Sequence, residues 1–247
     1  MPSPSLADRN ETTPPVNCRN CALGRNTLYG YVATHTPDVL NACRREVRNL
    51  PAGRSFTRDG EIQSRVWTLY AGWAYRYSTL SDGRRHIHYF HLPGDILVME
   101  SLLLPGIRLP FAVRSLTAVT LCAFDTAEAA AMVRSSPGQQ NQAALGWQQQ
   151  MADLHRHLSD IGRRSAMGRI SQLLLEIERR LSARQLADGG RFAFPVNQEQ
   201  IADALGLTTV YVNRTLDKLR QMEVIAFDRR HMHILQPGRL AEIAEEE

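Results

Sequence analysis

The segment from Val196 to Leu219 constrains the fold of this chain more than any other part of the sequence. Asn197 has the side chain of a helix N-cap, and Gly206 supplies the left-handed backbone that a tight turn between helices needs. Thr208 has the side chain to cap a second helix directly after that turn. Apolar residues recur at helical spacing on both sides of the turn: Ile201, Leu205, Val212, Leu216 and Leu219. The segment therefore predicts two short helices that share one core.

The second of these helices carries polar side chains on its other faces. Asparagine and arginine are side chains that pair with the edges of adenine and guanine in the major groove of DNA. The residues expected to contact bases or phosphates are Thr208, Thr209, Val210, Tyr211, Asn213, Arg214 and Lys218. We interpret the segment as a helix-turn-helix that places its second helix in a major groove. An ordinary helical hairpin with a solvated polar face is the alternative.

A short hairpin with a basic tip follows the two helices. Residues 224–227 and 232–235 have the pattern of β-strands, and Arg229 and Arg230 lie in the turn between them. Beside a helix-turn-helix, such a hairpin is a wing whose arginines contact the DNA backbone. The alternative is a surface hairpin with solvated arginines.

Length and composition allow this interpretation without proving it. A chain of 247 residues has room for one or two domains, and an apolar fraction of 43% is ordinary for a globular protein. The isoelectric point near 9.1 suits a nucleic-acid partner, although a net charge of +4 is modest. No apolar run reaches the length of a membrane-spanning helix and no signal peptide is present, so we expect a cytoplasmic protein and no membrane partner.

The chain divides into a tail and three blocks. Residues 1–27 are polar and proline-rich and carry a Cys-x-x-Cys motif, so we expect a flexible tail. Residues 28–136 read as short strands between Gly/Pro turns, with a helix over Pro37–Arg48, which is typical of a jelly roll. Residues 137–163 predict a long helix, and residues 164–247 the helix-turn-helix domain. The expected fold class is α+β, with an N-terminal β-roll, a long helix and a C-terminal winged helix-turn-helix. The strand-like runs of the roll include 66–69, 73–77, 86–90 and 118–124.

The long helix has a narrow apolar stripe. Its apolar residues are spaced four, three, four and three positions apart, which is a heptad pattern. They are Trp147, Met151, Leu154, Leu158 and Ile161. A stripe this narrow usually packs on a second copy of itself, so we expect these residues in the interface of a homodimer. Packing on its own domain is the alternative.

In this order, the β-roll, long helix and winged helix-turn-helix resemble the Crp/Fnr family of bacterial transcription regulators. The specific motifs are FHLPGD at Phe90–Asp95 and IADALGLTTVYVNRTLDKL at Ile201–Leu219. The likeness is nearer to the Fnr-like and FixK-like branch than to the cyclic-AMP receptor. It implies a roll that senses a signal, a dimerising helix, and a second helix that reads a pseudo-palindromic operator with half-sites about one DNA turn apart. An activator of this kind would also contact RNA polymerase.

The same resemblance implies a particular base contact. In the oxygen-sensing branch the second helix has a glutamate, two intervening residues, and then Ser-Arg. This chain has Val210 in place of the glutamate, Asn213 in place of the serine, and Arg214 in place of the arginine. We expect Arg214 to contact a guanine. Because the missing glutamate removes an acceptor for cytosine N4, we expect the half-site to differ at one base pair.

Cyclic-nucleotide-binding members of the family have a Gly-Glu segment followed by Arg-Ser or Arg-Thr. Here Glu100 follows Met99, and the pair Arg114-Ser115 comes several residues late, inside an expected strand. No arginine is well placed for a cyclic phosphate, so its charge would be poorly compensated. We therefore expect that cyclic AMP is not the signal.

The oxygen-sensing branch holds an iron–sulfur cluster with four cysteines, and such a cluster normally needs four thiolates. The candidate ligands here are Cys18, Cys21, Cys43 and Cys122. Thr27 stands where that branch has its third cysteine, so Cys43 or a carboxylate such as Asp38 would have to substitute. Two alternatives stay open: a [4Fe–4S] cluster that senses oxygen or redox state, or a regulator without a cofactor, controlled by its abundance or by another ligand.

The histidines and the Cys-x-x-Cys motif suggest other chemistries, which the pattern does not favour. We interpret His86, His88 and His91 as surface or hydrogen-bonded residues rather than haem or zinc ligands, and His155 and His157 point apart on a helix. Thiol oxidoreductases place Cys-x-x-Cys after a strand at a helix N-terminus, a context that this chain lacks. No hydrolase triad, phosphate loop or carboxylate pair stands out, so we expect no enzymatic activity.

Overall fold

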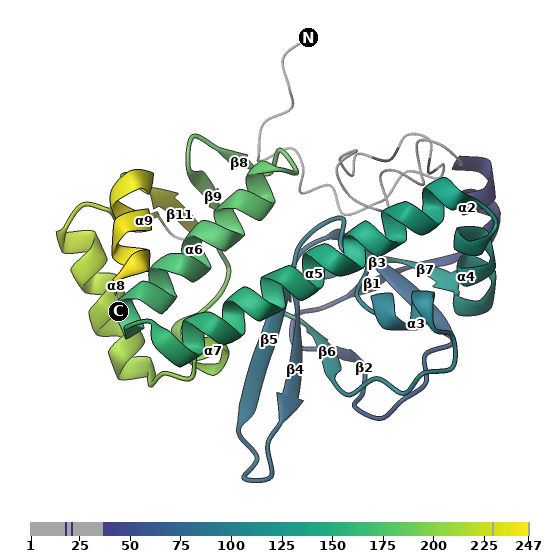
Figure 1. Ribbon diagram of the computed structural model, residues 1–247, viewed down its shortest axis with the longest axis horizontal. Helices are drawn as coiled ribbons and strands as arrows, with labels where there is room; N and C mark the ends of the chain where they lie inside the picture. Colours follow the sequence, from purple (N-terminus) through teal and green to yellow (C-terminus); the bar gives the residue numbers. More distant parts are fainter. Residues whose placement is uncertain (1–17, 19–20, 22–36, 229, 247) are drawn as a thin grey trace. The chain divides into compact units, whose positions relative to one another are not determined.

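The computed structural model describes Cys18, Cys21 and residues 37–228 and 230–246 (Figure 1). Short strands and helices precede one long helix, after which mostly helices follow. The elements are α2 Pro37–Cys43, β1 Arg44–Leu50, β2 Ser55–Thr57, β3 Arg65–Ala71, β4 Ala74–Thr79, β5 Arg85–His91, α3 Met99–Leu103, β6 Ala112–Ser115, β7 Val119–Asp125, α4 Thr126–Arg134, α5 Pro137–Arg163, α6 Ala166–Ser182, β8 Ala187–Asp188, β9 Arg191–Ala193, α7 Gln198–Leu205, α8 Thr209–Gln221, β10 Ile225–Asp228, β11 His231–Ile234 and α9 Pro237–Glu245.

The chain forms two compact units. The first comprises Met1–Ser78 and Tyr89–Met151, and the second comprises Thr79–His88 and Ala152–Glu247. Helix α5 therefore belongs to the first unit up to Met151 and to the second unit beyond it. The expected flexible tail, residues 1–27, lies outside the described residues except for Cys18 and Cys21.

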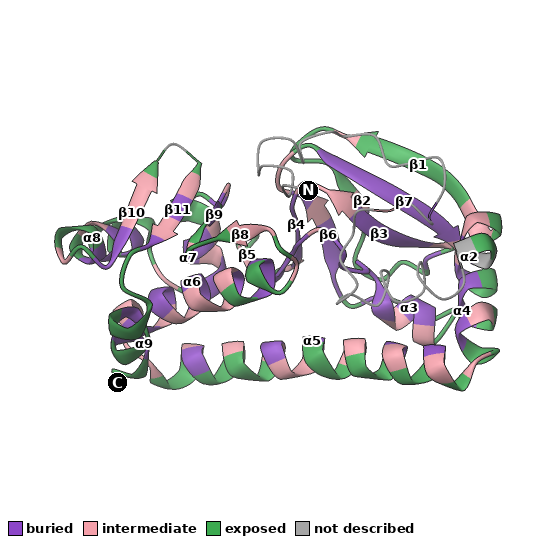
Figure 2. Ribbon diagram, turned by 90° about the horizontal axis from the view of Figure 1, so that it is seen from above, coloured by how far each residue is buried: buried purple, intermediate pink, exposed green. Residues whose placement is uncertain are grey.

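The first unit is a β-roll built from two antiparallel sheets, except that β5 as far as His88 is counted with the second unit. Their strand orders are β1-β7-β3 and β2-β6-β4-β5. Strand β7 is the centre of the three-stranded sheet, where Cys122 lies opposite Val47 of β1 and Thr68 of β3. The residues of β7 before Asp125 are all buried, as expected for a strand covered on both faces. In Figure 2, β7 and β3 form the most continuously buried stretches of the roll.

The turn between β3 and β4 requires a glycine. Gly72 has a φ of +82°, which is a left-handed conformation. A Cβ atom added there would lie 2.1 Å from the backbone oxygen of Ala118. Any other residue would force the chain after β3 away from the β6–β7 loop, so this glycine sets how closely the two segments approach.

The expected strands are confirmed, since β3, β4, β5 and β7 coincide with the four strand-like runs except for Trp73 and Ala118. The expected helix over Pro37–Arg48 is wrong in its second half. The helix ends at Cys43, and Arg44–Leu50 forms β1, which pairs with β7 over its length. Charged residues of β1 do not favour a strand by themselves, so the ladder with β7 overrides local propensity.

The second unit holds a winged helix-turn-helix. Helix α6 buries one face, formed by Ile170, Leu173, Leu174, Ile177 and Leu181. Helices α7 and α8 contact this helix, and a small sheet of order β10-β11-β9-β8 completes the unit. A roll, a long helix and a winged helix-turn-helix are thus present in the expected order, and the fold class is confirmed as α+β.

Helix α5 extends over 27 residues and is unevenly buried along its length (Figure 2). Buried positions such as Ala143, Gln150 and Asp153 alternate with exposed ones, so one face is covered and the other is open. Among the described residues, no helix combines the length and the apolarity that crossing a membrane requires.

Candidate nucleic-acid interface

Local hydrogen bonds define the ends of α7 and α8. The Asn197 side chain accepts from the backbone N–H of Gln200 at 2.8 Å, and the Gln200 side chain accepts from the backbone N–H of Asn197 at 2.9 Å, which is a capping box. Gly206 ends α7 with a φ of +64°. The Thr208 hydroxyl then accepts from the backbone N–H of Tyr211 at 3.2 Å. The capping and turn roles expected of Asn197, Gly206 and Thr208 are confirmed.

Apolar side chains hold the two helices together. All five residues expected to face the shared core are buried: Ile201, Leu205, Val212, Leu216 and Leu219. Ala202 is buried between them, and its small side chain lets the helices approach closely. Burial on this scale fixes the rotation of α8 about its axis, and therefore fixes which side chains it presents outward.

The opposite face of α8 is open. Thr209, Val210, Tyr211, Asn213, Arg214 and Lys218 are all exposed, as is the capping residue Thr208. The side chains include two large apolar ones, Val210 at 60% and Tyr211 at 55% exposure. A helix with its first turn open in this way can enter a major groove and bring polar and apolar groups to base edges.

Gln198 was missed by the sequence analysis. Its side-chain amide donates to the Asn213 side-chain oxygen at 2.9 Å, which joins the start of α7 to the exposed face of α8. Gln198 and Thr209 also line a hollow of about 500 Å³ beside the first turn of α8. No local pattern marks this pair, because the two residues come together only when the helices cross.

The expected wing is present as β10 and β11. The two strands pair from Ile225 opposite Ile234 to Asp228 opposite His231. Arg230 lies exposed at the tip, whereas Arg229, also expected to contact phosphates, lies outside the described residues. An ion pair of 3.0 Å joins Asp228 to a side chain of β9, Arg191.

The five residues of the apolar stripe expected at a dimer interface, here called the seam of α5, differ in their surroundings. Trp147 packs against the apolar cluster of the roll. Met151, Leu154 and Ile161 are half-buried, and Leu158 has an exposed fraction of 61%. Within one chain, the C-terminal half of α5 therefore leaves Leu158 uncovered.

The interior of the roll contains an ion pair. The Arg76 guanidinium donates to the Glu100 carboxylate at 2.8 Å, and the two side chains are only 6% and 12% exposed. The guanidinium carbon of Arg76 also lies 3.9 Å from the centre of the Phe111 ring. Arg114, from the late Arg-Ser pair, donates instead to the backbone oxygen of Gly53 at 2.7 Å. The expected position of Arg114 in a strand is confirmed by β6.

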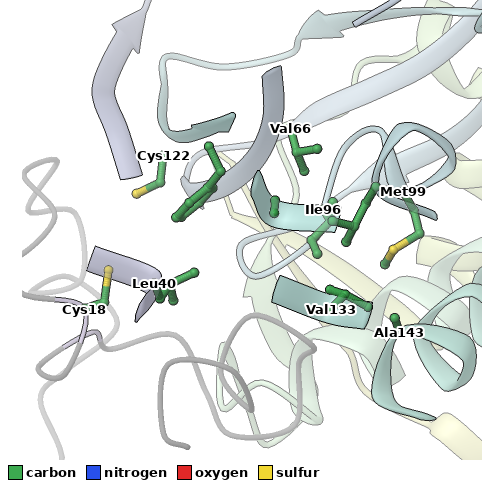
Figure 3. Packing of buried hydrophobic residues seen from close by; sticks show 11 residues of the cluster. Cys18, Leu40, Val66, Ile96, Met99, Cys122, Val133 and Ala143 are labelled. Atoms are coloured by element: carbon green, nitrogen blue, oxygen red, sulfur yellow. The ribbon is translucent and has the colours of Figure 1, made fainter. Parts of the chain in front are cut away.

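The four cysteines gather around one apolar cluster of the roll. Cys18 and Cys122 are buried members of it, and Cys21 and Cys43 pack against it. Figure 3 shows Cys18 and Cys122 at the same end of the cluster, with Leu40 of α2 beside Cys18. Residues from the N-terminal segment, α2 and β7 thus share one environment.

Among the described residues, the four cysteines are not arranged as an iron–sulfur site in this structure. In the described part of the chain, no group of three or more histidine, cysteine, aspartate or glutamate side chains is arranged to hold a metal ion. Burial, followed by the nearby Glu128 carboxylate, raises the pKa of the Cys43 thiol. A raised pKa disfavours the thiolate that iron requires.

Three histidines come together in the second unit. The rings of His86 and His88 on β5 have centroids 5.3 Å apart, and the His86 ring stacks at 6.3 Å on His157 of α5. Burial, followed by the charge of His86, lowers the pKa of His157. No sequence pattern places His157 beside His86, because the two residues are far apart in the chain.

Two family models match the chain. Residues 168–243 match the Crp-like helix-turn-helix domain, and residues 47–136 match the cyclic nucleotide-binding domain. Together these segments cover the roll and the winged helix-turn-helix.

Several proteins resemble the chain over most of its length. The chain is 32% identical over 198 residues to the nitrogen fixation regulation protein FixK of Rhizobium meliloti (strain 1021), covering 79% of this chain and 86% of that protein. It is 29% identical over 242 residues to the transcriptional activatory protein AadR of Rhodopseudomonas palustris, covering 98% and 99%. Among solved structures, FixK2 from Bradyrhizobium japonicum superposes with a TM-score of 0.73 at 25% identity, covering 82% of this chain and 98% of that one.

Proposed function

Since the chain belongs to the Crp/Fnr family of transcription regulators, in its Fnr/FixK branch, we propose that it is a homodimeric regulator that binds a pseudo-palindromic operator in double-stranded DNA. It acts on DNA as a regulator rather than as an enzyme, and its place is the cytoplasm, where the operator lies. Contact with RNA polymerase follows if it activates transcription.

The observation that carries this proposal is the open face of α8. A buried stripe fixes the helix in the domain, while Asn213 and Arg214 extend outward beside two exposed apolar side chains. Arginine gives guanine a bidentate partner, and asparagine bonds adenine or other base edges. The exposed Lys218 and Arg230 supply positive charge for phosphates on either side of the groove.

Dimerisation rests on α5. Leu158 exposes most of an apolar side chain, and Leu154 and Ile161 lie half-buried one turn to either side of it. A second copy of α5 packed on this seam would remove that surface from water. Two-fold symmetry then gives two copies of α8, spaced for half-sites about one DNA turn apart.

The proposed signal is not a cyclic nucleotide. Glu100 lies near the place where cyclic-nucleotide-binding members have Gly-Glu, but it follows Met99 and already pairs with Arg76. Arg114 bonds the backbone of Gly53, so it does not provide the missing phosphate partner. A cyclic phosphate buried here would therefore lack charge compensation.

A redox role of the cysteines is a second candidate function. One observation favours it: all four cysteines contact the same apolar cluster, although they are far apart in sequence. The test is iron content and operator affinity of the wild type, Cys21→Ser and Cys43→Ser, each prepared with and without oxygen. Iron-free anaerobic protein whose DNA binding is indifferent to air would exclude this role. Iron binding that survives Cys43→Ser would remove Cys43 from the ligands.

The main proposal is tested by repeated selection of random duplex DNA with the purified full chain and no added nucleotide. We expect one enriched pseudo-palindrome whose half-sites lie about 10 base pairs apart. Enrichment of no sequence, or of an unpaired single site, would contradict the proposal.

A further inference from the structure

The first turn of α8 exposes an apolar side chain where base readers are expected. Val210 is 60% exposed, although its helix buries every residue of the opposite stripe. A β-branched residue in a solvent-exposed helix position loses side-chain freedom and gains no burial in return. Val210 therefore contributes nothing evident to the stability of the domain, and it is free to contact a ligand surface.

The position of Val210 on the helix relates it to the expected guanine reader. Val210, Asn213 and Arg214 are three and four residues apart, so they form one strip along the exposed face. Four residues correspond to about 6 Å along a helix axis, against about 3.4 Å between stacked base pairs. Val210 thus reaches a base one or two pairs from the one that Arg214 contacts.

The neighbours of Val210 limit how that base is read. Tyr211 is exposed on the adjacent side, and Thr209 precedes it in the first turn. Gln198 engages the Asn213 side chain rather than Val210. The isopropyl group has no donor or acceptor, so it cannot distinguish bases by hydrogen bonds. Of the four bases, only thymine presents an apolar group in the major groove, its 5-methyl.

We propose that Val210 is a specificity-determining residue that reads a thymine through its 5-methyl group, one or two base pairs from the guanine read by Arg214. This inference rests on the proposed function, since it needs α8 in a major groove. It predicts a thymine at one position of this half-site. A regulator with a glutamate in place of Val210 would prefer another base at that position. A glutamate at the same position would instead accept from the amino group of cytosine.

The test removes the methyl group and nothing else. Each thymine of the selected operator is replaced by deoxyuridine, in both half-sites together, and the affinity of the full chain is measured at one salt concentration. We expect a single thymine, next to the guanine or one pair beyond, whose replacement weakens binding about fourfold per half-site. All other thymines should tolerate the change.

Two variants assign the effect to Val210. Val210→Ala should bind the thymine operator less tightly and lose most of its preference over the deoxyuridine operator. Val210→Glu should favour cytosine at that position. Lys218→Gln is the matched control, because loss of a phosphate contact weakens both operators by the same factor. Since both Val210 and Lys218 are exposed, circular dichroism should show unchanged folding in all three variants.

The outcomes separate this inference from the proposed function. If no operator can be selected, the proposed function itself fails. If an operator is selected but no thymine near the Arg214 guanine is sensitive to deoxyuridine, the reading by Val210 is wrong. The same holds if Val210→Ala keeps the full preference for thymine.

Discussion

Arg76 and Glu100 form an ion pair in the interior of the roll, with a 2.8 Å hydrogen bond between guanidinium and carboxylate. The Arg76 side chain is 6% exposed and covers the ring of Phe111. In such a buried position, the charge of each side chain is compensated by the charge of its partner. The pair therefore connects β4 to α3.

Removal of one partner of this pair should destabilise the roll strongly. We expect Arg76→Leu to lower the free energy of unfolding by about 3–5 kcal/mol, because it leaves a buried carboxylate unpaired. The double variant Arg76→Leu/Glu100→Leu should recover most of that loss. Urea unfolding followed by tryptophan fluorescence reports on this unit, since all three tryptophans lie in it. Arg84→Leu is the control, because Arg84 is exposed and should give no measurable change. Equal midpoints for Arg76→Leu and wild type would mean that the pair is not formed.

Loss of the Arg214 side chain should weaken operator binding. We expect Arg214→Ala to cost roughly 1–3 kcal/mol of binding free energy per half-site and to relax the preference for guanine at one position. Arg220→Ala on the same helix is the control, since Arg220 pairs with Asp217 and is not among the residues expected to read bases. An affinity of Arg214→Ala equal to that of the wild type would rule out this base contact.

Two charges placed on the α5 seam should separate the proposed dimer. Leu154 and Leu158 would each bury an apolar side chain worth about 1.5–3 kcal/mol, counted twice by symmetry. We expect Leu154→Glu/Leu158→Glu to sediment as a monomer and to bind the operator weakly. His155→Glu introduces the same charge at an exposed position off the seam and should stay dimeric. A stable dimer of the double variant would show that the seam packs on its own chain.

Acid should weaken the second unit through His157. Burial and the neighbouring His86 lower the pKa of His157 in the folded chain below its ordinary value of about 6.5. Folding therefore favours the neutral ring, so this contribution is complete above about pH 6.5 and is lost as the pH falls through the lower folded-state pKa. Thermal unfolding by circular dichroism at about pH 7.5 and about pH 5.5 measures this loss. It should shrink in His157→Gln and persist in His155→Gln, whose ring is exposed; an identical acid response of all three proteins would contradict this assignment.

Local signals predicted the helix-turn-helix closely. Asn197, Gly206 and Thr208 act through hydrogen bonds and backbone angles within a few residues, so their roles can be inferred from sequence neighbours. The heptad spacing is also a pattern among sequence neighbours, so it predicted a long helix. Helix α5 extends over residues 137–163 as expected.

Long-range contacts could not be predicted in this way. The partners Arg76 and Glu100 are 24 residues apart, and Gln198 and Asn213 are 15 apart, so no periodic pattern links them. The segment after Cys43 has charged residues that do not indicate a strand, so a helix was expected there. It forms a strand because it pairs with β7. The cysteine cluster likewise depends on how α2 and β7 pack, which spacing does not reveal.

The central claim is sequence-specific binding of DNA through α8. Its most direct test is the ratio of affinities of the wild-type chain for the selected operator and for a scrambled duplex of the same length and composition, without nucleotide. Both are measured at one salt concentration, because phosphate contacts make every affinity salt-dependent. We predict a ratio of about 10³ or more. A ratio near one would contradict the account.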